Sequence, residues 1–477
     1  MVSTKKLDKR KEALVSINTI TSSFNHPKSI IKKLKTTDDL PFKDVLSSDS
    51  IAAHVNKINY RERFFTPDIT IWTFLSQVLS EDQSCQNAVA KIIAFFISQG
   101  KEAPSANTAA YCKARARLAD DILSSLAKES AEKLEEETPS KWLWRNKYIK
   151  IIDGSTVSMP DTPENQAVYP QSSTQKQGVG FPIARIAVVI SYATGAILDL
   201  AICPYAGKHT SEFALLRQMM HVFKPGDVAM ADSYYGSYFV IAMLIRKKVD
   251  VVFPVHHARG CDFRKGKRLG NKDHIVEWKK PKKPDWMDQS TYDSFPEQLS
   301  IREVEIKKQR KGFRPKTRVI VTSFFDEKDV CRDDLNILYS CRWYVELDLR
   351  SIKDVMGMNI LRGRTPQMVR KEIWAHVLAY NLIRKIMAQA AIVHGKKPRE
   401  LSFKITVQIT ASFRQTGICS EQNYNYEKLL KAIAYKTVGN RPGRHEPKRV
   451  KRRPKPYDLL LEPRSFYHKE EKCIILS

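Results

Sequence analysis

The sequence lacks the features of secreted and membrane proteins. Its N-terminus, MVSTKKLDKRKEALV, carries charged residues without the apolar segment that follows them in a signal peptide. The longest apolar stretch, residues 183–202, is interrupted by Arg185, Asp199 and a turn, and is too polar for a transmembrane helix. The eight cysteines are scattered and include no C-x-x-C pair, which argues against a zinc site or a disulfide framework. We therefore expect a cytoplasmic protein with no membrane segment.

Acidic residues are few for the number of basic ones. The 477 residues include 80 Lys and Arg against 52 Asp and Glu, which gives a formal net charge of +28. An excess of this size favours a polyanion as partner, because cations that neutralise phosphates release condensed counterions. A solvated basic surface is the alternative, but the charge favours nucleic acid.

The apolar pattern divides the chain into three parts, with no internal repeat. Residues 1–140 have helical apolar spacing and are predicted to form a helical N-terminal domain. Residues 141–395 open with a strand hairpin and then alternate strands and helices, which predicts an α/β core with a mixed sheet. Within that core, residues 256–325 are predicted to be an all-β insertion. Residues 396–477 are predicted to be helical and then basic.

One predicted helix in the N-terminal part carries a row of basic residues. The segment SANTAAYCKARARLAD begins with Asn107 or Thr108 as the N-cap. Lys113, Arg115 and Arg117 follow along the helix. They form either a solvated face or a face that contacts DNA, and the net charge of the chain keeps both readings open.

A second basic segment lies near the end of the chain. Residues 441–455, RPGRHEPKRVKRRPK, are too rich in proline and charge to build a core. We predict a flexible basic arm that contacts phosphates, with Lys451, Arg452 and Arg453 in it. A disordered tail that only aids solubility is the alternative.

Two aspartates follow apolar strands. Asp153 comes after YIKII and Asp232 after DVAMA, each before a small or polar turn. Ligands gather at the carboxyl ends of strands in α/β sheets. Either Asp alone is explained as a turn residue, but two matching cases favour a shared site.

The segment LYSCRWYVELDLRSIKDVMG (338–357) supplies a third acid. In a regular helix Tyr339, Arg342, Glu346 and Lys353 would lie within an arc of about 60°. Asp348 would lie on the other side, so Glu346 is the better partner for the two aspartates. Three carboxylates suit Mg²⁺ or Mn²⁺ rather than zinc. A salt bridge between Glu346 and residue 350 is the structural alternative for part of this charge.

At these residues the sequence resembles the IS4 family of DDE transposases. The spacing Y-x2-R-x3-E-x6-K is the signature of that family, and it fits residues 339 to 353 without a gap. The segments IIDGSTVSMPDT and DVAMADSYYGSY resemble the two Asp motifs of the family. The segment 256–281 resembles its β-rich insertion, and the whole resemblance runs from about residue 70 to 464.

The resemblance implies an RNase H-like catalytic core that uses Mg²⁺, for which Mn²⁺ can substitute. It implies that Asp153, Asp232 and Glu346 are both the catalytic residues and the metal ligands. A second set of residues would hold phosphates near the cut end: Tyr339, Arg342 and Lys353. Asp161 and Asp199 are the reserve acids.

The resemblance also implies an aromatic residue in the insertion that stacks on a flipped base. Stacking of this kind contributes about 1–3 kcal/mol per base. Trp278 is our candidate, with packing on the insertion hairpin as the alternative.

We therefore predict a prokaryotic, DNA-associated cut-and-paste transposase. Its helical N-terminal domain and basic C-terminal region would bind double-stranded DNA at terminal inverted repeats. Its core would cleave the element ends and join the 3′-hydroxyls to target DNA, in at least a homodimer. The alternatives are an RNase H-fold metal-dependent nuclease that cleaves without joining, and a catalytically inactive DNA-binding relative.

Overall fold

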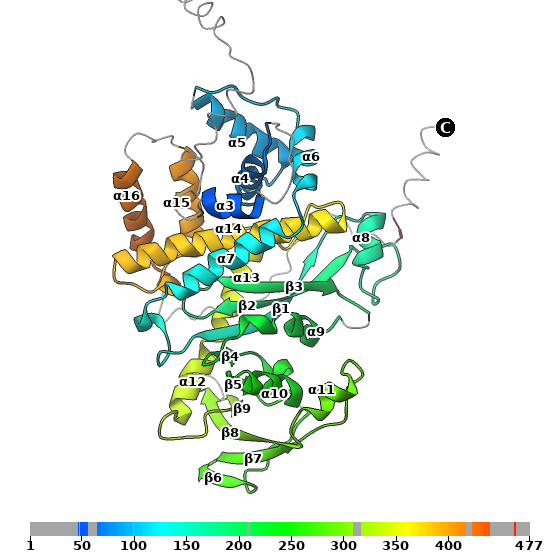
Figure 1. The fold of residues 1–477 in the computed structure, drawn as a ribbon, viewed down its shortest axis with the longest axis vertical. Coiled ribbons are helices and arrows are strands. Elements are labelled where there is room, and N and C mark those ends of the chain that lie inside the picture. Colours follow the sequence, from blue (N-terminus) through cyan, green and yellow to red (C-terminus); the bar gives the residue numbers. More distant parts are fainter. Residues whose placement is uncertain are drawn as a thin grey trace, which may run out of the picture.

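The computed structural model describes residues 46, 48–55, 64–98, 100–207, 210–256, 258–308, 316–415, 422–438 and 462–463. Within these residues, nine strands form one mixed sheet in the order β3-β2-β1-β4-β5-β9-β8-β7-β6. The sheet follows the long axis of the molecule, with most helices gathered around its β3 end (Figure 1). The strands are β1 (Ile149–Ser158), β2 (Ile183–Ser191), β3 (Ile197–Pro204), β4 (Val228–Met230), β5 (Asp250–Pro254), β6 (Lys267–Gly270), β7 (Asp273–Lys279), β8 (Gln298–Lys308) and β9 (Lys316–Thr322).

The first five strands have the arrangement of an RNase H-like core. β1, β2 and β3 form an antiparallel meander, and β4 and β5 follow parallel to β1. The apolar, β-branched sequences of β2 and β3 suit this position, because both strands are buried over most of their length. The strand order 3-2-1-4-5 confirms the predicted mixed-sheet α/β fold class.

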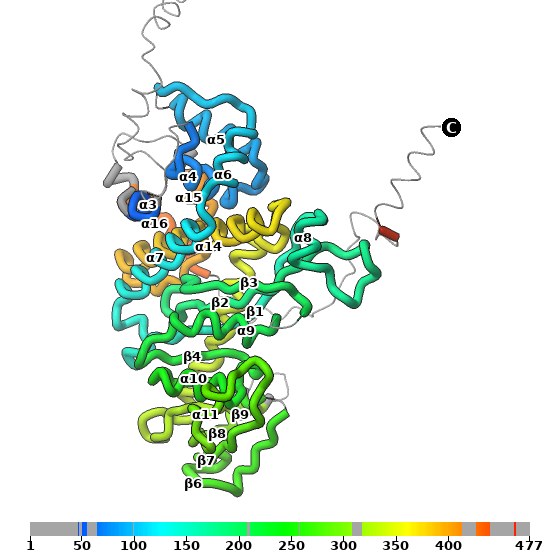
Figure 2. Tube along the Cα trace, turned by 45° about the vertical axis from the view of Figure 1, so that its right-hand side comes forward, coloured from blue at the N-terminus to red at the C-terminus, as the bar shows by residue number. Residues whose placement is uncertain are grey.

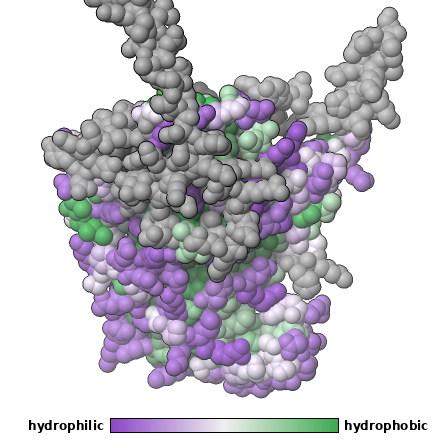
Figure 3. Space-filling model, turned by 45° about the horizontal axis from the view of Figure 1, so that its top comes forward, coloured by the Kyte–Doolittle hydropathy of each residue, from purple (hydrophilic) through white to green (hydrophobic). Residues whose placement is uncertain are grey.

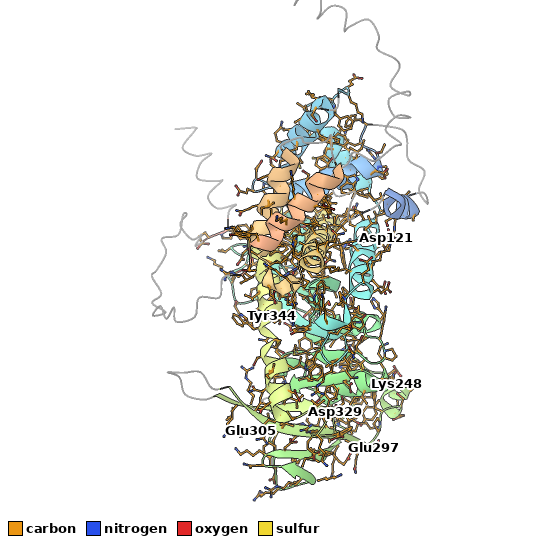
Figure 4. The ribbon with its side chains drawn as sticks, turned by 90° about the vertical axis from the view of Figure 1, so that its left-hand side faces the viewer. Asp121, Lys248, Glu297, Glu305, Asp329 and Tyr344 are labelled. Atoms are coloured by element: carbon orange, nitrogen blue, oxygen red, sulfur yellow. The ribbon has the colours of Figure 1, made fainter. Side chains whose placement is uncertain are left out.

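Two crossover helices cover one face of this core. α9 (Glu212–Gln218) connects β3 to β4, and α10 (Tyr238–Arg246) connects β4 to β5. Both connections advance across the sheet in the same direction between parallel strands, so right-handed crossovers place both helices on one face. Figure 1 shows them in front of the strands. In Figure 4, Tyr344 of α13 (Trp343–Arg350) and Lys248, which follows α10, lie on opposite sides of the strands.

The insertion extends the catalytic sheet. β9 pairs antiparallel with β5, and β8, β7 and β6 continue the sheet at the bottom of Figure 1. A short helix, α11 (Gln289–Asp293), interrupts these strands, so the prediction of an all-β insertion is wrong in that detail. The helix begins where Asp288 caps it, because the Asp288 carboxylate accepts a hydrogen bond from the Thr291 amide at 2.7 Å.

Two helices cover the β3 edge of the sheet. α7 (Ile122–Glu136) packs on β3 and on the long helix α14 (Pro366–Val393), which crosses the molecule above the sheet in Figure 1. α14 is buried on nearly all sides, because α4, α15 and α16 also pack on it. The other helices are α3 (Ser48–Val55), α4 (Pro67–Val78), α5 (Cys85–Ser98), α6 (Ala109–Arg117), α8 (Pro163–Val168), α12 (Arg332–Ser340), α15 (Phe403–Gln415) and α16 (Gln422–Tyr435).

The N-terminal helices contribute to two cores. Phe65, Phe96 and Tyr111 belong to a small apolar core among α4, α5 and α6. α7 instead contributes Leu123 and Leu126 to the main core under the sheet. The predicted boundary at residue 140 therefore follows a helix that packs on the α/β core.

Figure 2 shows the segment around α8 projecting to the side of the sheet.

Hydrophilic residues cover most of the described surface in the view of Figure 3. None of the helices in the described ranges has the length and apolar character needed to cross a membrane.

The orientation of α13 depends on a buried ion network behind it. Asp348 is only 1% exposed and pairs with Arg384 of α14 and with Arg399, whose Nη2 lies 2.9 Å from Asp348 Oδ2. Arg399 also donates to the Ser191 carbonyl at 3.0 Å, at the end of β2. The guanidinium of Arg384 lies against Gly195, where a Cβ would come within 2.8 Å of it, so only glycine fits this turn. Asp348 thus ties α13 to α14 and to the β2–β3 hairpin.

We predict that Asp348→Asn destabilises the fold by roughly 3–5 kcal/mol, because it leaves two buried guanidinium groups without a counter-charge. The thermal unfolding midpoint measures the effect. The control is Asp354→Asn, because Asp354 is 59% exposed and pairs with Arg350 at the surface. Equal midpoints for the two variants would contradict the proposed importance of the buried network.

Candidate active site

Asp153 lies in β1, and Asp232 follows the neighbouring parallel strand β4. β1 pairs with β4 so that Ile149 faces Val228 and Ile151 faces Met230. Two residues further along each chain stand Asp153 and Asp232, on the same side as that last pair. The prediction that Asp153 ends its strand is wrong, because β1 continues beside β2 to Ser158. β4 does end before Asp232. The two carboxylates are close enough for the charge of Asp232 to act on Asp153.

The carboxyl group of Asp153 is largely enclosed. Its side chain is 17% exposed, and its Oδ1 accepts a hydrogen bond from the Gly154 amide at 2.9 Å. Burial raises the pKa of Asp153 to about 6, and the negative charges of Asp232 and Glu212 act in the same direction. The Gly154 amide and the Arg342 guanidinium oppose this rise in pKa.

Asp232 is held by the start of a short 3₁₀ turn, Ser233–Tyr235. Its Oδ1 accepts a hydrogen bond from the Tyr234 amide at 2.9 Å, which makes Asp232 the cap of that turn. The turn explanation is therefore confirmed for this residue, and the charge of Asp232 also acts on Asp153.

The signature segment is not the single regular helix that its sequence predicts. α12 ends at Ser340, a turn follows at Cys341 and Arg342, and α13 begins at Trp343. From Ser351 to Val355 the chain continues as a π-helix. Irregular turns of this type relocate side chains within a helix and occur often at functional sites. The four signature residues therefore do not form the straight stripe of a regular helix.

Arg342 brings the third acid to the first. Its Nη1 lies 3.6 Å from Asp153 Oδ2, and its Nη2 contacts Glu346 Oε1. The guanidinium thus stands between two carboxylates from different elements, β1 and α13. The structure places Asp153 and Glu346 around one positive charge and places Asp232 within electrostatic reach of Asp153.

The other two signature residues point to the neighbouring strands. Lys353, in the π-helix, donates to Ser155 Oγ at 2.8 Å, and Ser155 is on the same side of β1 as Asp153. Tyr339 is 7% exposed, and its hydroxyl accepts a hydrogen bond from Arg318 of β9 at 3.3 Å. Lys353 therefore contacts the strand that carries Asp153. Tyr339 instead is buried and contacts Arg318 of β9. Arg318 and Ser155 were not predicted, because no local motif marks them.

The donors in this site suit a hard divalent cation, although they are not gathered around one point. Among the residues that the structure describes, no three Asp, Glu, His or Cys side chains lie close enough together to hold an ion. Arg342 stands between Asp153 and Glu346 and supplies the positive charge there. All candidate donors are carboxylate oxygens, which Mg²⁺ and Mn²⁺ prefer. The residue types therefore suit such an ion, although the described positions do not gather them around one.

A further acid, Glu212, lies near Asp153 and Asp232. It opens α9, and Tyr235 donates to its Oε2 at 3.0 Å. A Cβ on Gly154 would meet the Glu212 carboxyl carbon at 2.4 Å, so this carboxyl group lies against β1 directly after Asp153. The sequence TSEF indicates only the start of a helix, so it could not predict that Glu212 lies near Asp153.

Trp278 is in the interior of the insertion, contrary to the prediction that it stacks on a flipped base. The side chain is 2% exposed, and its Nε1 donates to Glu303 Oε1 at 2.8 Å. The Arg259 guanidinium covers the ring at 3.9 Å from its centroid. The ring has no free face for a base, so the packing alternative describes this residue.

Arg115 also fails as a DNA contact. It donates to Gln77 Oε1 at 3.0 Å and lies over the rings of Phe74 and Tyr111, at 5.0 and 4.9 Å from their centroids. Its position on the inner face of α6 follows from the core that the helix packs against. Lys113 and Arg117 are exposed on the outer face, as a DNA contact requires.

The two reserve acids make contacts elsewhere, and the predicted basic arm is not described by the structure. Lys451, Arg452 and Arg453 lie outside the described residues. The reserve acid Asp199 pairs with Lys128 at 2.8 Å and joins β3 to α7. Asp161 is exposed and accepts a hydrogen bond from Gln166 at 2.8 Å.

Comparison with known proteins places these acids inside a recognised domain. A family described as the transposase DDE domain matches residues 144–382. The transposase InsG for insertion sequence element IS4 of Escherichia coli (strain K12) is 23% identical over 354 residues, 74% of this chain and 76% of that protein. A solved piggyBac transposase synaptic complex with hairpin DNA aligns with a TM-score of 0.42 and 11% identity, over 84% of this chain and 85% of that one. The family match includes all three predicted acids.

We predict a pH-dependent stability difference for Asp153→Asn in metal-free buffer. An unfolded Asp loses its proton near pH 3.9, whereas folded Asp153 keeps it to about pH 6. The stability of the parent therefore falls as the pH rises between these values. Because Asn does not titrate, the variant should be more stable at pH 7.5, by roughly 3 kcal/mol.

Chemical denaturation at pH 7.5 and pH 4 measures this difference. The advantage of Asp153→Asn over the parent should shrink at the lower pH. Asp161→Asn, at an exposed acid, is the control and should show no such change. A difference between parent and Asp153→Asn that is the same at both pH values would exclude this account of Asp153.

Proposed function

The chain belongs to the IS4 family of transposases with a DDE domain, and on this premise we propose that it moves an insertion sequence by a cut-and-paste route. It is an enzyme that cleaves and joins DNA. In the proposed reaction, it first hydrolyses the phosphodiesters at the element ends. It then directs the freed 3′-hydroxyls at phosphodiesters of target DNA. Both steps are phosphoryl transfers, in which positioning and charge stabilisation provide most of the catalysis.

The observation that carries this proposal is the proximity of Asp153 to two acids from other parts of the chain, Asp232 and Glu346. Asp153 lies in β1, and Asp232 follows the end of β4, which pairs in parallel with β1. Arg342 contacts both Asp153 and Glu346 of α13. Their positions in the RNase H-like sheet and in the signature spacing are independent facts. Together these facts support Asp153, Asp232 and Glu346 as the catalytic triad.

DDE transposases work with a divalent metal ion, and here we assign Mg²⁺, with Mn²⁺ as a substitute. Asp153, Asp232 and Glu346 would hold it through carboxylate oxygens, which both ions prefer. When bound, the metal supplies activation of the attacking water or 3′-hydroxyl and stabilisation of the leaving oxygen.

The signature cations would hold the DNA backbone. Lys353 reaches the same side of β1 as Asp153, which supports contact with a phosphate near the cut end. Arg342, once released from the carboxylates, would present a planar guanidinium that suits a phosphate. The Tyr339 hydroxyl accepts a hydrogen bond from Arg318, so its proposed contact with DNA would be made together with that arginine.

Contacts further from the chemistry would select the element ends. The exposed Lys113 and Arg117 of α6 lie on the outer surface of the N-terminal helices. We assign double-stranded DNA with terminal inverted repeats to this surface and to the basic segment that includes Lys451, Arg452 and Arg453. Cutting two ends in one complex requires at least two active sites, which favours a homodimer on DNA.

Replacing any one of the triad residues, in Asp153→Asn, Asp232→Asn or Glu346→Gln, should reduce end cleavage about a hundredfold or more, because each removes charge from the site of phosphoryl transfer. The assay uses a duplex with the inverted repeat that brackets the gene, Mg²⁺, and purified full-length protein. Asp161→Asn is the control and should cleave like the parent.

A strand-transfer assay with pre-cleaved ends separates this proposal from its alternatives. Joined products with short target duplications support a transposase. Cleavage without joined products would leave a nuclease, and a parent protein that binds ends without cutting them would leave an inactive DNA-binding relative.

The double variant Lys113→Ala/Arg117→Ala should bind duplex DNA more weakly. The slope of log K against log salt concentration should fall by about 2, because two phosphate contacts are removed. Fluorescence anisotropy at several salt concentrations measures it. The control is Lys133→Ala, because Lys133 pairs with Glu129 on α7. An unchanged slope in the double variant would remove α6 from the DNA-binding surface.

A further inference from the structure

We propose that residues 359–365, here called the arginine loop, bind the phosphate backbone of the element-end duplex. Two exposed arginines of this loop, Arg362 and Arg364, would hold the DNA between the active site and α6. The inference rests on the proposed function, because it names a further contact surface for the same DNA. Neither arginine belongs to the four-residue signature.

The arginine loop is joined to the strand that carries Asp153. It follows the π-helix of Lys353 in the chain, and residue 360 forms a parallel bridge with Ser158 at the end of β1. The Leu361 amide donates to the Ser158 carbonyl at 2.8 Å. Ser158 stands five positions after Asp153, which is roughly 17 Å along an extended strand. The loop therefore lies beside the strand of the proposed catalytic site, beyond the contact that Lys353 makes.

A buried acid holds the backbone of the arginine loop. Glu372 of α14 is only 6% exposed, and its carboxylate accepts hydrogen bonds from the amides of Arg362 and Gly363, at 2.9 and 2.7 Å. Burying a carboxylate is unfavourable unless hydrogen bonds replace those to water. Here these hydrogen bonds also fix the loop against α14. A Cβ on Gly363 would lie 2.7 Å from the Val369 nitrogen, so glycine permits this close approach.

The region of α8 holds the arginine loop from another side. Asn165 Nδ2 donates to the Gly363 carbonyl at 3.0 Å, and the Thr162 hydroxyl donates to the Arg364 carbonyl at 2.9 Å. The backbone is thus fixed, while the side chains of Arg362 and Arg364 are exposed. Within the described ranges, no acidic side chain forms a salt bridge with either of them. A loop ordered before binding loses less conformational entropy when a ligand binds, which favours a binding role over two merely solvated arginines.

The arginine loop also lies next to the basic helix α6. Lys371, near the start of α14, donates to the Ala116 carbonyl at 2.8 Å, at the end of α6. Asp120 is an acid at this junction, and Arg370 and Lys371 pair with it at 3.8 and 3.3 Å. Figure 1 shows the lower end of α6 close to the end of α14 that lies beside α8. The loop therefore stands between the proposed catalytic site and the exposed cations of α6.

A duplex fits this arrangement better than a small anion does. The cations follow one another along β1 and toward α6, so they do not converge on one point. Each strand of a duplex offers one phosphate per 3.4 Å of rise, so roughly 17 Å corresponds to about five nucleotides. Arg362 and Arg364 should therefore contact phosphates about five nucleotides from the cut end. Guanidinium groups suit phosphates, because they donate two parallel hydrogen bonds.

The double variant Arg362→Ala/Arg364→Ala tests this contact in full-length protein with the end duplex. Lys133→Ala/Lys224→Ala is the matched control, because it removes the same charge from two lysines that pair with acids of α7. Fluorescence anisotropy at several salt concentrations measures the affinity. The arginine variant should bind about tenfold more weakly, and the slope of log K against log salt concentration should fall by about 2. The control should keep the slope of the parent.

Neutral methylphosphonate linkages, placed at one phosphate at a time, locate the contact on the DNA. In the parent, linkages about five nucleotides inside the element should weaken binding. The Arg362→Ala/Arg364→Ala variant should be unaffected by them. If that variant lowers the thermal midpoint, Arg362→Gln/Arg364→Gln replaces it, with the same loss expected. Arg362→Lys/Arg364→Lys keeps both charges and should retain most of the salt slope.

The outcomes distinguish this inference from the proposed function. A salt slope in Arg362→Ala/Arg364→Ala equal to that of the parent, or a parent unaffected by neutral linkages at that position, would overturn the inference. End cleavage by the parent would then leave the proposed function intact. Equal losses in the arginine variant and the lysine control would reveal a general charge effect and would also overturn the inference. A parent that neither binds nor cuts the end duplex would overturn the proposed function itself.

Discussion

The buried pairing of Asp348 with Arg384 and Arg399 determines which face of the signature helix meets the sheet. Asp348 and Glu346 lie on different sides of α13, so fixing one directs the other. Arg384 belongs to α14, and Arg399 contacts the end of β2. The network therefore fixes the position of α13 relative to both α14 and the β1–β3 meander. Glu346, the proposed catalytic acid on α13, is therefore positioned near β1 by contacts within the protein.

The irregular backbone around α13 then sets where the flanking cations point. The turn at Arg342 interrupts the helix between Tyr339 and Glu346, and the guanidinium turns toward Asp153. After Arg350 the π-helix widens the backbone, and Lys353 reaches Ser155 on the same strand. A regular helix would align these side chains along its own axis. The observed irregularities instead direct Arg342 and Lys353 toward β1, where they contact Asp153 and Ser155.

The sequence predicted what local pattern controls and missed what packing partners control. The strand runs predicted the mixed-sheet α/β fold class, because apolar period is a local property. The signature spacing pointed to Glu346, which shares Arg342 with Asp153. Trp278 and Arg115 were misassigned, because an exposed and a buried aromatic or arginine look alike until Glu303 or Gln77 is placed beside them. The contact at Gly154 could not be predicted either. It is made with the Glu212 carboxyl group, from a helix 58 positions further along the chain.

The charge balance of the site links its acids to its cations. Arg342 is shared between Asp153 and Glu346, while Asp232 and Glu212 add negative charge nearby. One guanidinium cannot neutralise this set, and the raised pKa of Asp153 records the cost of burying its charge. A divalent ion at the carboxylates would take over the charge that Arg342 supplies. The Arg342 guanidinium would then be available to a DNA phosphate. Arg342 would therefore neutralise the carboxylates before metal binds and contact the DNA backbone afterwards.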